Sequence, residues 1–279
     1  GQATVGDTIG VADGRYLAKS ESDIQVVTLD NIVNLSGGWN SSFSSQVGKS
    51  TIDGQNVRRC IFITYSAANK TIDHFVVQNG YTEYDPFDSG SGNGAGIYIS
   101  SFANVTIINS SIHNNTASAD YSKGGGIYNW GNFLTLINTG IAYNSAFTGG
   151  GVYNEGGSSH HFQNVTISHN SAGESGGGLF TQNGVFTIQN STISENQAVL
   201  AASGILSFSA LTLENSIVVG NAPGTCSHPD YQATGIVSSG HNLFNGTCNI
   251  TMTETDLVIG NPKLGTYLTT QGYQPLQAG

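Results

Sequence analysis

The chain has 279 residues, of which 38 are glycines and 9% are charged, and its formal net charge at pH 7 is −10. Its hydrophobic fraction of 38% excludes a disordered polar chain. Residues 124–262 contain no Lys or Arg, and no apolar run reaches the length of a membrane span. We therefore expect no nucleic-acid partner and no membrane insertion.

The first part of the chain is weakly patterned, and residues 1–49 are predicted to form an N-terminal arm and cap region. Within it, residues 1–20 are a candidate arm that pairs with the sheet edge of a neighbouring molecule. Regular coils are predicted over residues 50–222, with an inserted loop at residues 81–93.

This inserted loop is acidic. It contains Glu83, Asp85 and Asp88, and Asp120 lies in the next loop. Carboxylates are the oxygen ligands that Ca²⁺ prefers, so these four residues form a candidate calcium site. Their spacing matches neither an EF-hand nor a nonapeptide calcium repeat, and a solvated loop without a metal is the favoured alternative. No other cofactor is expected.

A repeat of about 25–30 residues runs through the coil region. It is marked by the last glycine of each Gly-rich turn and by two asparagines six residues apart. The glycines are Gly96, Gly126, Gly151, Gly178 and Gly204, and the asparagine pairs are Asn109/Asn115, Asn138/Asn144, Asn164/Asn170, Asn190/Asn196 and Asn215/Asn221. Apolar residues alternate before each first asparagine, as in a strand with one buried face, and the alternation restarts after it. Each repeat is therefore predicted to carry three short strands.

A unit of this size with no helical pattern cannot bury its own apolar face, so it must stack on copies of itself. The pattern predicts a single all-β domain, a parallel β-helix, with Gly and Asn at corners that need positive φ. Asparagines stacked in register are expected to hydrogen-bond along the axis. Residues 223–279 break the period and are predicted to form C-terminal coils and a cap. A disulfide between Cys226 and Cys248 is expected there, whereas Cys60 is expected to be a buried thiol on a strand.

The Gly-Gly-Gly-Ile/Val-Tyr turns and the Asn-x-x-Ile-x-x-Asn strands resemble a known family. They are similar to the right-handed parallel β-helix repeat proteins secreted by bacteria, which are related to the polymorphic outer-membrane proteins. Residues 36–54 resemble the opening segment of that family, and residues 226–248 with 259–265 resemble its C-terminal signature, although Asn261 replaces an Asp. The resemblance implies a right-handed parallel β-helix in a secreted or surface protein. Because the chain begins at Gly1 without a signal-peptide pattern, we expect the signal peptide to be already removed.

A catalytic site would have to come from residues that stacking brings together. The regular coils lack the cations of a pectate-lyase-like site and the clustered Asp of a polygalacturonase-like site. Tyr143, His169 and Glu195, each directly before the second asparagine of its coil, are expected on one face of adjacent coils. Tyr and His are the acid/base pair of some polysaccharide lyases. Ordinary solvent-facing positions are the favoured alternative.

An aromatic column follows the glycine turns. The residue two positions after each marker glycine is aromatic in four coils, namely Tyr98, Tyr128, Tyr153 and Phe180. Inward-facing aliphatic residues alternate with these residues, so the rings are expected to point outward as a stripe. The stripe is either covered by other segments of the same chain or used for contact with another subunit or with sugar rings.

Two further features leave alternatives open. His160 falls in an otherwise apolar column, so it is either a buried, hydrogen-bonded histidine or follows a shifted turn, and the shifted turn is favoured. Ten Asn-x-Ser/Thr sequons are candidate glycosylation sites, although chance occurrence in an Asn-rich repeat is favoured. They begin at Asn34, Asn40, Asn69, Asn104, Asn109, Asn114, Asn164, Asn190, Asn245 and Asn249.

The leading functional hypothesis is a non-catalytic structural or adhesive protein, secreted or at the cell surface. Its partner is expected to be a second copy of the chain or a surface glycan, and its ends are candidates for stacking into extracellular filaments. A lyase-type polysaccharide-active enzyme and a glycan-binding module are the alternatives.

Overall fold

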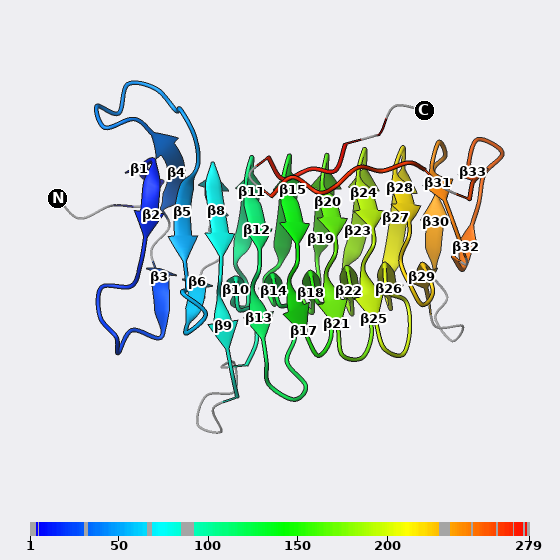
Figure 1. Cartoon of the computed structure of the whole chain (residues 1–279), viewed down its shortest axis with the longest axis horizontal. Helices are drawn as coiled ribbons and strands as arrows, with labels where there is room; N and C mark the ends of the chain where they lie inside the picture. Colours follow the sequence, from blue (N-terminus) through cyan, green and yellow to red (C-terminus); the bar gives the residue numbers. More distant parts are fainter. Residues whose placement is uncertain are drawn as a thin grey trace.

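The structure is a computed structural model that describes residues 4, 6–30, 33–65, 69–84, 92–228, 235–246, 248–260, 262–269, 271–275 and 277. The described residues contain β-strands and no helix, and the strands wind into one elongated stack of coils (Figure 1). No helix within these ranges is long and apolar enough to cross a lipid bilayer.

A coil of the central region carries four strands. Three of them lie where the repeat predicts them: β10 (Ile97–Ile99) after the glycines, β11 (Asn104–Ile108) before the first asparagine, and β12 (Ser111–His113) between the two asparagines. The fourth, β13 (Thr116–Ala117), follows the second asparagine. Two residues are too few to show an alternation of side chains, so the sequence does not predict this strand.

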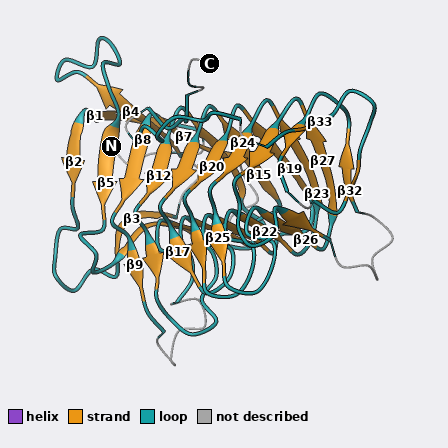
Figure 2. Ribbon diagram, turned by 45° about the vertical axis from the view of Figure 1, so that its right-hand side comes forward, coloured by secondary structure: helices purple, strands orange, loops and turns teal. Residues whose placement is uncertain are grey.

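Equivalent strands of successive coils pair in parallel and build four sheets (Figure 2). Sheet A contains β1 (Thr8–Ala12), β4 (Asn34–Trp39), β7 (Asn69–Asp73), β11, β15 (Phe133–Ile137), β19 (Ser159–Gln163), β23 (Val185–Gln189), β27 (Ala210–Glu214), β30 (Ile236–Ser238) and β32 (Ile250–Thr251). Sheet B contains β2 (Gly14–Tyr16), β5 (Ser50–Asp53), β8 (Phe75–Gln78), β12, β16 (Gly140–Ala142), β20 (Thr166–Ser168), β24 (Thr192–Ser194), β28 (Ile217–Val219), β31 (Leu243–Phe244) and β33 (Leu257–Val258). Sheet C contains β3 (Gln25–Leu29), β6 (Arg59–Ile63), β10, β14 (Ile127–Asn129), β18 (Val152–Asn154), β22 (Leu179–Thr181), β26 (Ile205–Ser207) and β29 (Cys226–Ser227). Sheet D contains β9 (Tyr81–Thr82), β13, β17 (Ser145–Ala146), β21 (Ser171–Ala172) and β25 (Gln197–Ala198).

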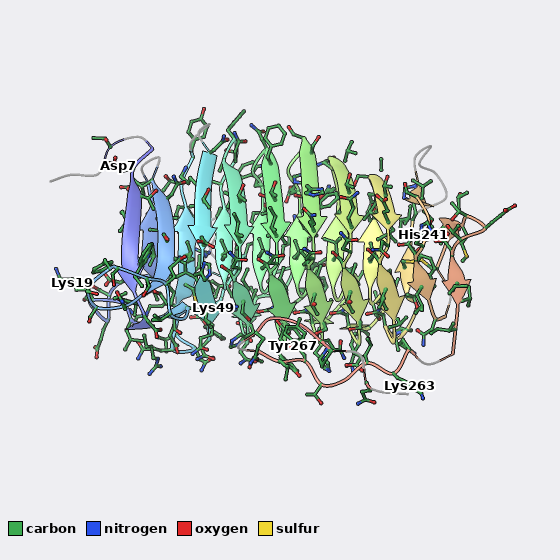
Figure 3. The ribbon with its side chains drawn as sticks, turned by 90° about the horizontal axis from the view of Figure 1, so that it is seen from above. Asp7, Lys19, Lys49, His241, Lys263 and Tyr267 are labelled. Atoms are coloured by element: carbon green, nitrogen blue, oxygen red, sulfur yellow. A yellow bond between two sulfur atoms is a disulfide. The ribbon has the colours of Figure 1, made fainter. Side chains whose placement is uncertain are left out.

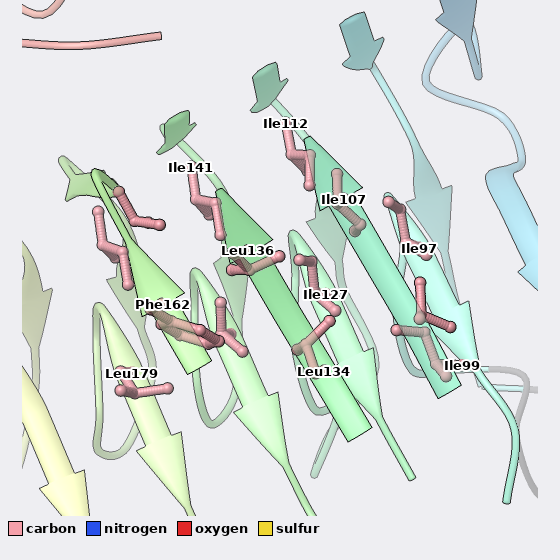
Figure 4. Packing of buried hydrophobic residues seen from close by; sticks show 14 of the residues in the cluster. Ile97, Ile99, Ile107, Ile112, Ile127, Leu134, Leu136, Ile141, Phe162 and Leu179 are labelled. Carbon is pink, nitrogen blue, oxygen red and sulfur yellow. The ribbon is translucent and has the colours of Figure 1, made fainter. Parts of the chain in front are cut away.

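The core is an aliphatic column that runs along the axis of the stack. Ile107 of β11, Ile112 of β12 and Ile127 of β14 are fully buried, and Figure 4 shows their side chains pointing into the same interior. Because each coil contributes inward-facing residues from three sheets, the apolar faces that the repeat predicts are buried only by stacking.

The asparagines play two different structural roles. The first asparagine of each pair has a left-handed backbone, with φ of 50° at Asn109 and 55° at Asn164. The second asparagine is buried and joins a ladder along the axis, in which Asn144 Nδ2 donates to Asn170 Oδ1 at 3.0 Å. This ladder confirms the expected hydrogen bonds between stacked asparagines. The second left-handed corner, however, falls on the residue before the second asparagine.

The stack of coils begins before residue 50 and continues after residue 222. β1 pairs with β4 and β2 pairs with β5 of the same chain, so residues 8–16 begin the first coil, which β3 continues. The expectation of an arm at residues 1–20 that pairs with a neighbouring molecule is therefore wrong for residues 8–16, which pair within their own chain. Sheets A, B and C start before the predicted boundary at residue 50, and after residue 222 they continue into C-terminal coils, as the sequence predicts.

The cysteines lie as the sequence predicts. Cys226 and Cys248 form a disulfide in the C-terminal coils. Cys60 is a fully buried thiol in β6, and its Sγ donates to the Gln78 carbonyl at 3.1 Å. Burial raises the pKa of the Cys60 thiol far above its usual range.

After the last coil the chain turns back along the stack, a feature that the repeat does not predict. The described residues of 262–275, here called the strap, run across the outer face of sheet B (red in Figure 1). The strap folds on itself as a hairpin, because Leu268 N donates to Tyr273 O at 2.9 Å and Gly265 N donates to Pro275 O at 2.7 Å.

Candidate functional site

The candidate catalytic residues lie together at one corner of the stack. Tyr143, His169 and Glu195 directly follow β16, β20 and β24, so parallel pairing places them on adjacent coils. The rings of Tyr143 and His169 have centroids 4.8 Å apart, and His169 Nε2 lies 2.7 Å from Glu195 Oε2. The expected juxtaposition of the three side chains is confirmed.

Their backbone conformation is unusual for such residues. All three are left-handed, with φ of 55° at Tyr143, 57° at His169 and 56° at Glu195. Neighbouring coils have Asn114 and Gly220 at the same corner, which are residues that tolerate this region. A bulky side chain there costs about 1–2 kcal/mol. Backbone strain of this kind is concentrated at functional sites, so it supports a functional role for these three side chains.

The strap holds this corner from outside. Gln274 Nε2 donates to Glu195 Oε2 at 3.2 Å, and Ser194 Oγ donates to Gln274 Oε1 at 2.5 Å. Farther along, the ring of Tyr267 meets that of Tyr143 edge-on, with centroids 6.0 Å apart. Neither strap residue was singled out from the sequence, because no periodic signal marks them.

The strap requires small residues beneath it. Gly140, Ala142, Ser168 and Ser194 face outward from sheet B, yet all four are buried. A Cβ atom at Gly140 would collide with the Tyr267 hydroxyl. The strap therefore lies in a shallow channel of small side chains across the coils.

The chemistry available to the histidine at this corner is restricted. His169 Nε2 is engaged by Glu195, and His169 Nδ1 is buried with no hydrogen-bond partner in the described residues. Neither ring nitrogen is thus free to exchange a proton with a substrate arriving from solvent. Glu195, with 43% of its side chain exposed, and Tyr143, which is 37% exposed, are the accessible members.

The aromatic column does not form an accessible stripe. Tyr98, Tyr128 and Tyr153 are only 4–7% exposed, and Phe180 packs against them. The rings stack along the axis with centroid separations of 4.9, 5.9 and 4.7 Å. The interpretation of these residues as a contact surface is therefore wrong, and the covered alternative fits.

Long side chains from sheet C and its corners cover this column. The Lys123 ammonium lies 4.8 Å from the Tyr153 ring centroid, and the Arg59 guanidinium lies 5.1 Å from that of Tyr98. Glu155 accepts a hydrogen bond from the Tyr128 hydroxyl at 2.9 Å. Burial and this carboxylate raise the pKa of Tyr128. Hydrogen-bonded hydroxyls and cation–π contacts stabilise the column without leaving a face for sugar rings.

The candidate calcium site is only partly described. Asp85 and Asp88 lie outside the described residues, whereas Glu83 and Asp120 lie within them. Among the described residues, no three His, Cys, Asp or Glu side chains are grouped so that they could hold a metal ion. Asp120 borders a hollow of about 620 Å³ together with Tyr84 and Tyr121. A calcium site at this loop stays a prediction.

His160 occupies the apolar column after all. It is 2% exposed, pairs in register with Leu134 and Phe186, and stacks on the Phe186 ring with centroids 4.5 Å apart. Its Nδ1 accepts a hydrogen bond from Leu134 N at 3.2 Å, and its Nε2 lies 3.3 Å from the Gly156 carbonyl oxygen. The favoured prediction of a shifted turn is therefore wrong. Burial lowers the pKa of His160 to about 4.

Several sequon asparagines have the structural role proposed for them. Asn109, Asn164 and Asn190 occupy left-handed corners and belong to an outer ladder of side-chain hydrogen bonds. In this ladder Asn164 Nδ2 donates to Asn138 Oδ1 at 3.0 Å. A glycan on Asn164 would occupy the nitrogen that makes this bond. Glycosylation of any sequon stays a prediction.

Comparison with known proteins yields one match. A family model described as a right-handed beta helix region matches residues 59–257. No curated protein and no solved structure matches the chain.

Proposed function

Because the chain belongs to the right-handed β-helix family, we propose that it is a non-catalytic structural or adhesive protein, secreted or at the cell surface, that assembles end to end. The disulfide between Cys226 and Cys248 supports an oxidising compartment. A rod whose coils are cross-linked by hydrogen-bonded ladders suits a mechanical role. The relation to bacterial secreted β-helix proteins stays a prediction.

The observation that carries this proposal is the state of the two ends. β1, β2 and β3 form the first edge of sheets A, B and C, and β32, β33 and β29 form the last edge. Within the described residues, no strand pairs with the outer side of β1, β2, β3, β32 or β33, whereas Cys248 forms a parallel bridge with Cys226 on the outer side of β29. Unpaired strand edges are templates for pairing with another chain.

The two ends are suited to one another. All pairs within the sheets are parallel, so the last coil of one copy can pair in parallel with the first coil of the next. Apolar side chains are exposed near both edges, with Ile9 of β1 at 41% and Ile24, directly before β3, at 69%, and with Leu257 and Val258 of β33 at 59% and 64%. A head-to-tail contact of this kind repeats without closing and produces a filament.

Light scattering after gel filtration, with electron microscopy, tests this assembly. We expect concentration-dependent oligomers or filaments from the wild type, and their loss in Val258→Asp. Val199→Asp is the matched control, because Val199 is 68% exposed on a lateral corner. A protein that remains monomeric at all concentrations, or that assembles equally well with Val258→Asp, contradicts the proposal.

A lyase-type enzyme is the second candidate, favoured by the strained corner at which Tyr143 and Glu195 are accessible and His169 positions the Glu195 carboxylate. Release of unsaturated products from a panel of polysaccharides is the assay, with His169→Ala as the test variant. His161→Ala is the control, because His161 lies on the outer face of sheet A. Turnover that His169→Ala abolishes and His161→Ala leaves intact favours the enzyme.

A further inference from the structure

A hollow of about 770 Å³ lies on the outer face of sheet B, just beyond the end of the strap. Its floor comes from Thr51 of β5 and Val76 of β8, and the strap contributes Gln271. The wall is formed by residues 46–49 and by His74. Figure 3 shows Lys49 and Tyr267 on the same side of the molecule, with Lys263 farther along. The strap thus covers one part of this face and leaves the next part open.

Lys49 is the charged residue of the hollow, and its surroundings do not neutralise it. Burial lowers the pKa of its ammonium group. None of the ion pairs in the described residues includes Lys49. Two other cations, Arg15 and Lys123, do have carboxylate partners, in the pairs Arg15–Asp53 and Lys123–Glu155. A partly desolvated cation without a counter-ion costs free energy that an anionic ligand would recover.

The carboxylates near Lys49 are either bonded to other groups or form no ion pair with it. Asp53 accepts hydrogen bonds from Arg15 Nε at 2.9 Å and from Gln78 Nε2 at 2.7 Å. Asp73 lies 2.7 Å from His74 Nδ1 and accepts from Asn109 Nδ2 at 3.0 Å. Asp13 lies beside Gly48 and forms no ion pair with Lys49. An anionic ligand could therefore serve as the counter-ion of Lys49.

We propose that this hollow binds an acidic saccharide, with Lys49 as the counter-ion of its carboxylate. The hydroxyl of Thr51 is suited to a sugar hydroxyl, whereas the Gln46 amide nitrogen already donates to the Gly37 carbonyl at 3.0 Å. The contact between Asp73 and His74 Nδ1 orients the imidazole ring and leaves Nε2 for a further hydroxyl.

The rest of the lining also favours a sugar. Val47 and Val76 provide small apolar surfaces for the C–H face of a sugar ring. The lining is otherwise polar and offers no deep apolar pocket of the kind that a peptide side chain would fill. The site is separate from the strand edges and from the corner at Glu195, so it extends beyond the proposed assembly.

The test is calorimetric titration of the whole chain with a galacturonic acid trisaccharide. Maltotriose, a neutral trisaccharide, and acetylated trialanine, a peptide carboxylate, are the comparison ligands. We expect the acidic trisaccharide alone to bind. Lys49→Gln should weaken binding about tenfold or more, as for loss of one charge-assisted hydrogen bond. Lys49→Arg should retain much of the binding, because the charge is kept.

Lys19→Gln is the matched control, because Lys19 is exposed and does not line this hollow. It removes the same charge and should leave binding unchanged, while thermal unfolding verifies that both variants are folded. Equal binding of maltotriose, unaltered binding by Lys49→Gln, or no binding at all overturns the proposal. Binding of acetylated trialanine alone overturns the assignment to a saccharide. These outcomes do not depend on whether the chain forms filaments.

Discussion

Replacing Asn170 by Ala is the most direct test of how the stack is held together. The Asn170 side chain is fully buried and makes four hydrogen bonds. Its Oδ1 accepts from the backbone N and from Nδ2 of Asn144, each at 3.0 Å. Its Nδ2 donates to Ile141 O and to Asn196 Oδ1, each at 3.0 Å. The substitution therefore interrupts the ladder in the middle of the stack.

The expected loss follows from these bonds. Each net hydrogen bond contributes about 1 kcal/mol, and a buried donor without an acceptor, here the Asn144 N–H, costs about 1–3 kcal/mol. We expect Asn170→Ala to lower the free energy of unfolding by roughly 4 kcal/mol, a large fraction of the 5–15 kcal/mol typical of whole domains. The unfolding midpoint should fall by roughly 10 °C, at about 2–4 °C per kcal/mol for a chain of this order of length.

The assay is denaturant unfolding followed by circular dichroism, with thermal unfolding alongside. Asn164→Gly is the control, because Asn164 makes a bond in the outer ladder and its φ of 55° suits glycine. It should change the free energy of unfolding by less than about 1 kcal/mol. Equal losses in the two variants, or a loss below about 1 kcal/mol in Asn170→Ala, would refute the view that the buried ladder dominates.

Three further outcomes follow from the packing. Gly140→Ala should displace the strap, because its Cβ would meet the Tyr267 hydroxyl, and limited proteolysis should then cleave the strap faster than in Ala142→Gly. The pKa of His160 is about 4 when folded and 6.5 in its reference state, so the neutral form is preferred in the folded chain. The stabilisation it gives is present above pH 6.5 and is lost as the pH falls toward 4, and His160→Phe should reduce this acid sensitivity in unfolding measured across that range. Cys60 should resist a thiol reagent in the native protein and react only after unfolding, because it is buried and its pKa is raised; rapid labelling in buffer would contradict this.

The coils could be predicted from the sequence because the same positions of each repeat carry the apolar residues that are buried in the core. Ile112, Ile141 and Ile167 recur at one point of the period, and each lies fully buried in sheet B. The same register explains His160, which follows the column of Leu134 and Phe186 although its polarity suggests otherwise. Strand register, rather than the polarity of His160, decides that this side chain faces the core. A register shift of one residue would move every side chain of the strand to the opposite face.

The sequence could not show what lies on the outer faces of the sheets. Alternation correctly places Tyr128 on the side of β14 opposite to Ile127. It does not show that Lys123 and Glu155 lie over the neighbouring rings, because those two residues are 32 positions apart. Likewise, nothing periodic marks Gln274 as the partner of Glu195, 79 positions earlier. Long-range contacts outside the repeat carry no repeated signal.

The strap changes how such a stack should respond to stress. In a solenoid each coil contacts only its neighbours, so unfolding can proceed one coil at a time from an open end. The strap joins distant coils, because Thr269 O accepts from Ser111 Oγ at 2.7 Å while Gln274 contacts Ser194 on a coil three repeats farther along. Loss of the C-terminal coils would also release these bonds across the middle of the stack. The strap therefore couples unfolding of the last coils to unfolding of the central coils. Unfolding should be more cooperative than in a stack of the same coils without the strap.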